Sequence, residues 1–177
     1  EEPKLRQALI EAQIELAQRK AFPVIVLVTG FDGAGKGEVI QRLYEWLDPR
    51  HLRSNAYDTP SDDERMRPRM WRYWRDLPAK GDIGVVFASW YNDPIAATLR
   101  QEIDEAAFER DLAGIRRFER MLADEGALIL KFLLVVSRKR QRQRLKAVSR
   151  DAGNSRHVLD EWSGIKRRKW SMPLVAQ

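Results

Sequence analysis

Residues 24–37 read Val-Ile-Val-Leu-Val-Thr-Gly-Phe-Asp-Gly-Ala-Gly-Lys-Gly, an apolar run that leads into four closely spaced glycines. The run from Val24 to Val28 is rich in β-branched side chains and contains no polar residue, which is typical of a parallel strand buried on both faces. After the glycines, Val39, Ile40 and Leu43 recur at helical spacing. The stretch therefore predicts a buried strand, a glycine-rich turn and a helix.

A glycine-rich turn of this kind can bind phosphate. Its backbone amides can turn toward an anion, and the N-terminal end of the following helix adds a positive partial charge. A lysine at the start of that helix can reach a transferred phosphoryl group as a point charge. We therefore expect a phosphate site formed by Gly30, Gly33, Ala34, Gly35, Lys36 and Gly37.

The last position of the loop departs from the common phosphate-loop pattern. That pattern places Ser or Thr after the lysine to bind Mg²⁺ through its hydroxyl, whereas this chain has Gly37. The carboxylate of Asp32, inside the loop, is a candidate replacement ligand for the metal. An aspartate in a glycine-rich turn can equally cap the turn or the helix, so composition alone leaves both roles open for Asp32.

The rest of the chain alternates predicted strands with predicted helices. Such alternation indicates an α/β fold of three layers, in which helices cover both faces of a central, mostly parallel sheet. Ligands of such folds bind beyond the carboxyl ends of the strands, so we expect residues 30–37, 89–93 and 137–144 to converge at one edge. The expected strands are 24–28, 52–57, 83–87 and 128–136, and the expected helices are 3–20, 38–47, 60–75, 94–124 and 138–148.

The composition is that of a soluble globular protein. The chain of 177 residues and 20.6 kDa fits a single domain, with 44% hydrophobic and 33% charged residues. It has no cysteine, which excludes disulfides and thiolate metal sites. No stretch resembles a signal peptide or reaches the length that spans a bilayer. These features predict a cytoplasmic protein without a membrane partner.

Basic residues are concentrated in one segment. Residues 138–170 contain twelve Lys and Arg against three acidic residues, while the rest of the chain contains 20 basic and 23 acidic residues. A strongly cationic segment on a slightly acidic body is typical of a localised polyanion site, although a solvated helix face can carry the same run of charge.

Several motifs match one family in the same order along the chain. Residues 30–37 match the loop Gly-x-Asp-x-Ala-Gly-Lys-Gly of the family-2 polyphosphate kinases, which include polyphosphate:AMP phosphotransferases, at every fixed position. The chain resembles this family over about residues 1–150. The other matching positions are Arg72-Tyr73, Leu77-Pro78, Gly81, Ser89-Trp90-Tyr91-Asn92, Gly126, Lys131-Phe132, Ser137, Gln141 and Arg144.

The resemblance implies phosphoryl transfer between inorganic polyphosphate and a nucleotide (AMP, ADP or GDP), with Mg²⁺ as cofactor. It also implies a thymidylate-kinase-like phosphate-loop fold with a basic lid at about residues 138–170. On this resemblance Asp32, Lys36 and Arg144 are catalytic, and Asp32 also binds the metal. Further phosphate contacts are expected for Arg72, Arg138 and Arg142. Trp90, Tyr91 and Asn92 are the candidate nucleotide contacts. The ring of Trp90 or Tyr91 can stack on a base or, equally, anchor the end of the strand, and both roles stay open.

The second site departs from the family. Its members read Phe-Asp-Arg-Ser-Trp-Tyr-Asn-Arg there, whereas this chain has Phe87 in place of the aspartate, and Ala88 and Asp93 in place of the two arginines. A phenyl ring cannot bind Mg²⁺ and a carboxylate repels phosphate, so these departures question the catalytic competence of the domain on its own. The sequence is most like the degenerate half of tandem-domain members, which predicts a tandem partner domain or a homo-oligomer.

Other functions remain open at this point. A non-catalytic domain that binds polyphosphate or nucleotide and supports a catalytic partner agrees with Phe87, Ala88 and Asp93. An ATP-dependent nucleoside monophosphate kinase would be expected to have Ser or Thr at position 37 and an acidic residue near position 87. A nucleic-acid-binding protein would not explain the loop, so no nucleic-acid partner is expected.

A few further residues carry structural expectations. The helical spacing of Trp71 and Trp74 predicts core or domain-interface positions. Lys131 lies inside an apolar strand and is expected to reach the sheet edge with its charged end. Ser171 follows Trp170 too soon for the lid of the family, which predicts either a shortened lid or missing residues between them.

Overall fold

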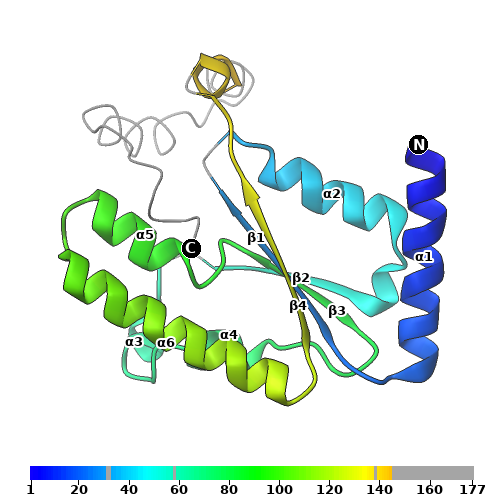
Figure 1. Ribbon diagram of the computed structural model, residues 1–177, viewed down its shortest axis with the longest axis horizontal. Coiled ribbons are helices and arrows are strands. Elements are labelled where there is room, and N and C mark those ends of the chain that lie inside the picture. Colours follow the sequence, from blue (N-terminus) through cyan, green and yellow to red (C-terminus); the bar gives the residue numbers. More distant parts are fainter. Residues whose placement is uncertain (31–32, 58, 138, 145–177) are drawn as a thin grey trace.

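The computed structural model describes residues 1–30, 33–57, 59–137 and 139–144. Within these ranges four strands form one sheet in the order β2-β3-β1-β4, and every neighbouring pair is parallel. Their carboxyl ends therefore lie at the same edge, as expected from the alternating pattern (Figure 1). The strands are β1 (Val24–Gly30), β2 (Leu52–Ala56), β3 (Ile83–Phe87) and β4 (Leu128–Leu134).

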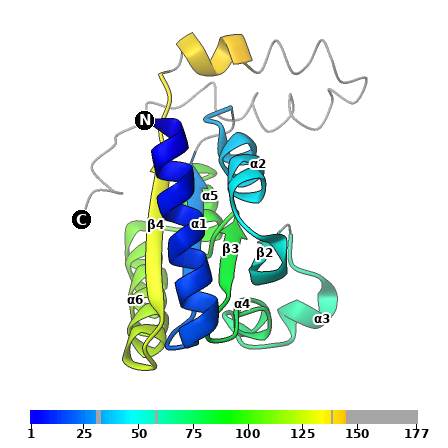
Figure 2. The same ribbon diagram turned by 90° about the vertical axis from the view of Figure 1, so that its right-hand side faces the viewer.

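Helices cover both faces of this sheet, which confirms the three-layer prediction (Figures 1 and 2). On one face, α1 (Glu2–Arg19) and α2 (Lys36–Trp46) pack against β1 and β3. The opposite face is covered by α4 (Trp71–Arg75), α5 (Asn92–Leu99) and α6 (Glu105–Asp124). A short helix, α3 (Asp62–Arg65), lies in the connection from β2 to α4.

The central position of β1 explains its unbroken apolar sequence. Ile25 and Leu27 belong to the core on the α6 side, where they join Ile115. Val26 belongs to the core on the other side, where Leu43 of α2 packs against it. Because successive side chains of a strand point to opposite faces, a strand covered on both faces needs an apolar residue at every position.

Two of the expected helices are interrupted. The pattern predicted one helix over 94–124, but the structure has α5 and α6, separated by residues 100–104. Gln101 adopts a left-handed φ of 59°, and Asp104 begins the new helix by accepting a hydrogen bond from the Ala107 amide at 2.7 Å. The predicted helix at 60–75 is likewise divided into α3, which carries a capping box between Ser61 and Glu64, and α4.

Asp104→Ala is expected to lower the free energy of unfolding by about 1 kcal/mol, because it removes the side-chain cap of α6. Chemical denaturation followed by circular dichroism measures the change. Asp124→Ala at the other end of α6 is the matched control, since removal of a negative charge from a helix C-terminus is neutral or slightly favourable. Equal losses from both variants would contradict the assignment of the cap.

The edge strand β4 exposes an unusual amount of apolar surface. Phe132 and Val135 are each 49% exposed, and β4 is paired on one side only among the described residues. The other exposed apolar side chains of this segment are Leu128, Leu130 and Leu133.

Among the residues that the structure describes, no helix is long and apolar enough to cross a membrane.

Candidate phosphate-binding site

The loop after β1 has a geometry that only glycine satisfies at two positions. Gly30 has a φ of 148°, and a Cβ atom there would lie 2.2 Å from the backbone oxygen of Leu134 on β4. Gly35 has a φ of 100° and is the residue directly before α2. A Cβ atom added there would lie 2.7 Å from the carboxylate of Glu38 and 3.2 Å from the guanidinium of Arg144. The tight turn predicted from the glycines is therefore present in the described part of the loop.

Lys36 lies between this loop and the end of β3. Its ammonium donates a hydrogen bond to the Gly30 oxygen at 2.8 Å, and it is 5.8 Å from the centroid of the Phe87 ring. Lys36 is also the first residue of α2, where the helix dipole is positive. A phosphate group at this helix N-terminus would therefore meet both the lysine charge and the loop amides.

The basic segment reaches the loop through one arginine. Residues 139–144 are helical, and Ser137 begins this turn by accepting from the Arg140 amide at 3.4 Å. The Arg144 guanidinium lies 3.2 Å from the Gly33 oxygen and 3.9 Å from the Glu38 carboxylate. The structure thus brings Arg144 to the loop. Arg142 is exposed on the same segment, while Asp32, Arg138 and the rest of the expected lid lie outside the described residues.

The end of β3 is tied to the loop by hydroxyl groups. Ser89 is fully buried, and its hydroxyl forms a short hydrogen bond with the hydroxyl of Thr29, the residue before Gly30. Between β3 and Ser89, Ala88 adopts a left-handed φ of 54°, a conformation that costs energy for a residue with a Cβ. The described parts of residues 30–37, 89–93 and 137–144 therefore converge at the carboxyl edge of the sheet.

Trp90 anchors the end of β3, which is one of the two roles expected for it. Its ring is 1% exposed and makes edge-to-face contacts with Tyr73 and Phe118, at centroid distances of 5.5 and 5.3 Å. Its indole N–H donates to Glu119 at 3.1 Å. A nucleotide contact by Trp90 remains a prediction. Tyr91 is only partly buried.

Asn92 is the first residue of α5, and its amide donates to the Ser89 oxygen at 2.8 Å. This bond closes the turn that leads from β3 into α5. Asp93 follows on the exposed surface of the first helical turn. Nucleotide contacts by Tyr91 and Asn92 remain predictions.

Arg72 is a packing residue in this structure. It is 7% exposed, and its guanidinium lies 5.0 Å from the Tyr57 ring centroid and 3.6 Å from the Glu64 carboxylate. Its neighbour Tyr73 is also buried, and this burial raises the pKa of the Tyr73 hydroxyl to about 12. The phosphate contact expected of Arg72 remains a prediction.

The described residues do not form a metal site by themselves. They contain no group of three or more His, Cys, Asp or Glu that could hold a metal ion. The residue at the end of β3 opposite Lys36 is Phe87, which has no ligand atom. Since Mg²⁺ is commonly held by one or two carboxylates together with substrate phosphates, its binding here would depend on Asp32 and on the substrate.

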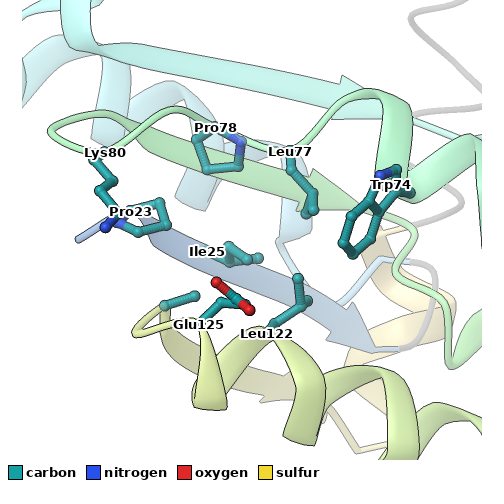
Figure 3. Close-up of a pocket in the computed structure, with 9 residues that line it drawn as sticks. Pro23, Ile25, Trp74, Leu77, Pro78, Lys80, Leu122 and Glu125 are labelled. Carbon is teal, nitrogen blue, oxygen red and sulfur yellow. The ribbon is translucent and has the colours of Figure 1, made fainter.

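A pocket of about 190 Å³ lies at the other end of the strands. Pro23, directly before β1, and Ala127, directly before β4, mark this end, and the side chains of Trp74, Leu77 and Leu122 surround the hollow (Figure 3). The pocket is therefore separate from the phosphate loop. Trp74 is 50% exposed, which argues against the core alternative, and its domain-interface alternative remains a prediction.

Glu119 was not predicted as a site residue. It accepts hydrogen bonds from Trp90 and Tyr91 and forms an ion pair with Lys131. The sequence did contain a signal, because Glu119 follows Phe118 and precedes Leu122 on the helical stripe that faces the core. Lys131 points to this carboxylate, and its side chain is 52% exposed on the edge strand, as its position in an apolar strand predicted.

The comparisons with known proteins agree with this geometry. The family model of polyphosphate kinase 2 matches residues 1–174. A polyphosphate:AMP phosphotransferase of Pseudomonas aeruginosa is 47% identical over 152 residues, which are 86% of this chain and 31% of that protein.

Two solved structures are also similar. A polyphosphate kinase 2 from Pseudomonas aeruginosa superposes with a TM-score of 0.76 at 42% identity, over 95% of this chain and 35% of that chain. Polyphosphate kinase 2 from Arthrobacter aurescens superposes with a TM-score of 0.79 at 27% identity, over 90% of this chain and 60% of that chain. The chain thus spans about a third of the length of the Pseudomonas relatives. It belongs to the polyphosphate kinase 2 family of phosphotransferases.

Proposed function

We propose that this domain binds inorganic polyphosphate at residues 30–37 and takes part in phosphoryl transfer between polyphosphate and a nucleotide, either AMP or a nucleoside diphosphate. We further propose that its transfer activity on its own is impaired. The observation that carries both parts is the contrast at one edge of the sheet. Lys36 sits in a complete glycine loop, and the side chain opposite it is the phenyl ring of Phe87.

The intact side of the site supports phosphate binding. Phosphoryl transfer relies mainly on positioning and on neutralisation of the phosphate charges. The loop amides and the start of α2 offer a cradle, and Lys36 and Arg144 add two cationic side chains beside it. When bound, Mg²⁺ supplies further positive charge to the phosphates, and Asp32 is the residue that would hold it.

The other side of the site supports impairment. Phe87 offers no metal ligand, and Ala88 offers no positive charge. Asp93 places a carboxylate in the first turn of α5, where it would repel a phosphate chain. Fewer charge-neutralising groups then act on the transferred phosphoryl, which raises the barrier to transfer more than it weakens binding.

A non-catalytic domain that supports a catalytic partner is the second candidate. The chain spans only 31% of the Pseudomonas aeruginosa relative. β4 exposes four apolar side chains, and Val135 directly after it a fifth, which another domain or a second copy could cover. An ATP-dependent nucleoside monophosphate kinase is less favoured, because position 37 lacks a hydroxyl and position 87 lacks a carboxylate.

The test is to restore the family residues in the triple variant Phe87→Asp/Ala88→Arg/Asp93→Arg. We expect at least about a tenfold rise in turnover, since single charge-stabilising groups at such sites typically contribute that much or more. The assay follows phosphorylation of AMP, ADP or GDP in the presence of polyphosphate and Mg²⁺. Asp124→Asn/Glu125→Gln, which makes the same net charge change far from the loop, is the control.

Each outcome is decisive. Turnover by the wild type equal to that of the triple variant would contradict impairment. Polyphosphate binding by both forms with turnover by neither would favour the non-catalytic function. If neither form binds polyphosphate, the proposed function is wrong.

A further inference from the structure

A charge network lies behind the turn that joins β3 to α5, with its carboxylate buried and its lysine half-exposed. The Glu119 carboxylate on α6 accepts from the Tyr91 hydroxyl at 2.8 Å and from the Trp90 indole at 3.1 Å, and its second oxygen lies 2.5 Å from the Lys131 ammonium. Lys131, on β4, also donates to the Tyr91 hydroxyl at 3.1 Å. The β3–α5 turn thus meets two later elements, α6 and β4, at one carboxylate.

Each polar group of this network depends on the others. Glu119 is 8% exposed, and a carboxylate removed from water is unfavourable unless it is paired and hydrogen-bonded. Burial by itself would lower the pKa of Lys131, but the hydrogen bonds to Glu119 and Tyr91 outweigh burial and raise that pKa. Burial and the contact with Glu119 raise the pKa of Tyr91, against the effect of Lys131. The phenol therefore stays neutral and can donate to the carboxylate.

Stability alone is a weak explanation for this arrangement. Replacement of a buried ion pair by well-packed apolar residues is often neutral or stabilising. The surroundings of Glu119 on α6, with Ile115, Phe118 and Leu122, would accept an apolar side chain. The network does what an apolar residue could not do, because it fixes the direction of the Tyr91 hydroxyl and ring.

The turn is also held from its other side. Ser89 is bonded to Thr29 beside the phosphate loop, and its hydroxyl accepts from the Tyr91 amide at 3.4 Å. The backbone of Tyr91 is thus tied toward the loop, and its side chain is tied to Glu119 and Lys131. The Lys131 ammonium lies 5.4 Å from the centroid of the Tyr91 ring, so it also contacts one face of that ring.

We propose that Glu119 and Lys131 are positioning residues that hold the partly buried ring of Tyr91 in the orientation that contacts the nucleotide. This inference rests on the proposed function and on the nucleotide contact that the sequence predicts for Tyr91. Glu119 and Lys131 touch neither substrate and act through the Tyr91 hydroxyl. Their loss should therefore weaken nucleotide binding and leave polyphosphate binding unchanged.

The experiment compares Lys131→Met, Lys131→Arg and Tyr91→Phe with the wild type. Isothermal titration calorimetry measures the Kd for AMP and, separately, for polyphosphate, and thermal unfolding shows that each variant is folded. We expect Lys131→Met and Tyr91→Phe each to raise the Kd for AMP by about tenfold, as for loss of a charge-assisted hydrogen bond. Lys131→Arg, which keeps the charge, should restore most of the affinity. Lys4→Met, on the exposed surface of α1, is the control.

The double variant Lys131→Met/Tyr91→Phe separates positioning from general destabilisation. If Lys131 acts through the Tyr91 hydroxyl, the double variant binds AMP as weakly as either single variant, whereas independent effects multiply to about a hundredfold. Multiplied effects, or equal losses of AMP and polyphosphate affinity, would overturn the inference. An unchanged Kd for AMP in Tyr91→Phe would overturn it even if Lys131→Met does not fold.

The two proposals fail in different ways. A wild type that binds both polyphosphate and AMP, with an affinity for AMP that Lys131→Met and Tyr91→Phe leave unchanged, overturns the positioning inference and leaves the proposed function intact. A wild type that does not bind polyphosphate overturns the proposed function itself.

Discussion

Lys36→Ala is expected to raise the Kd for inorganic polyphosphate by about 30- to 100-fold, equivalent to about 2–3 kcal/mol, which is the range for hydrogen bonds to charged groups. The reason is the position of the ammonium. Lys36 is the first residue of α2, and its ammonium lies 2.8 Å from the Gly30 oxygen at the end of β1, so the charge lies beside the proposed phosphate site. The side chain opposite is the uncharged ring of Phe87, and Arg144 remains as a second cation beside the loop, so part of the affinity is retained.

Calorimetry or fluorescence titration at one fixed ionic strength measures this loss, since salt screens interactions between polyanions and exposed cations. Lys36→Arg should retain part of the affinity because it keeps the charge but changes the geometry. Lys4→Ala removes one positive charge from the exposed surface of α1 and is the matched control. An equal loss in Lys4→Ala and Lys36→Ala would show that polyphosphate responds only to the net charge of the domain.

Gly30→Ala is expected to lower the free energy of unfolding by about 3 kcal/mol or more. Steric overlap in a packed region and backbone strain typically cause losses of this size. A Cβ atom at this position would lie 2.2 Å from the Leu134 oxygen, and the φ of 148° disfavours any residue with a side chain. Gly30 pairs with Leu134 in the ladder between β1 and β4, so the clash can be relieved only by separation of the two strands.

Urea denaturation followed by circular dichroism measures this effect. Gly114→Ala, the same substitution in the interior of α6, is the control and is expected to stabilise the domain by up to about 1 kcal/mol, because alanine favours helix more than glycine does. If Gly30→Ala unfolds at the same urea concentration as the wild type, the close approach of the loop to β4 is not a feature of the folded domain.

Much of the fold could be predicted from short stretches of sequence. The run Val24–Val28 indicated a strand covered on both faces, and the glycines after it indicated the turn into α2. The start of the helix predicted over 60–75 lies within two residues of the start of α3 at Asp62. These features depend on the conformational preferences of neighbouring residues, so a local pattern contains the information that determines them.

Other features could not be predicted because they depend on contacts between distant elements. Apolar residues continue at helical spacing through 94–124, so the break between α5 and α6 was not visible as a change of period. Trp90 follows a strand that ends at the phosphate edge, which suggested a ligand contact, but Tyr73 and Phe118 enclose its ring. The partners of Lys131 lie 12 and 40 residues away in the sequence.

By itself, the sequence determined the glycine-rich turn after β1 and the substitution of Phe87, Ala88 and Asp93 at the second site, because each of these is a property of consecutive residues. The alternation of strands and helices along the chain predicted the parallel sheet. Only the tertiary structure decided which side chains meet. It brought Arg144 to the loop, buried Trp90, and joined Glu119, Lys131 and Tyr91 behind the turn. The physical reason is that the desolvation and pairing of a side chain depend on which elements pack around it, and packing joins residues without regard to their separation along the chain.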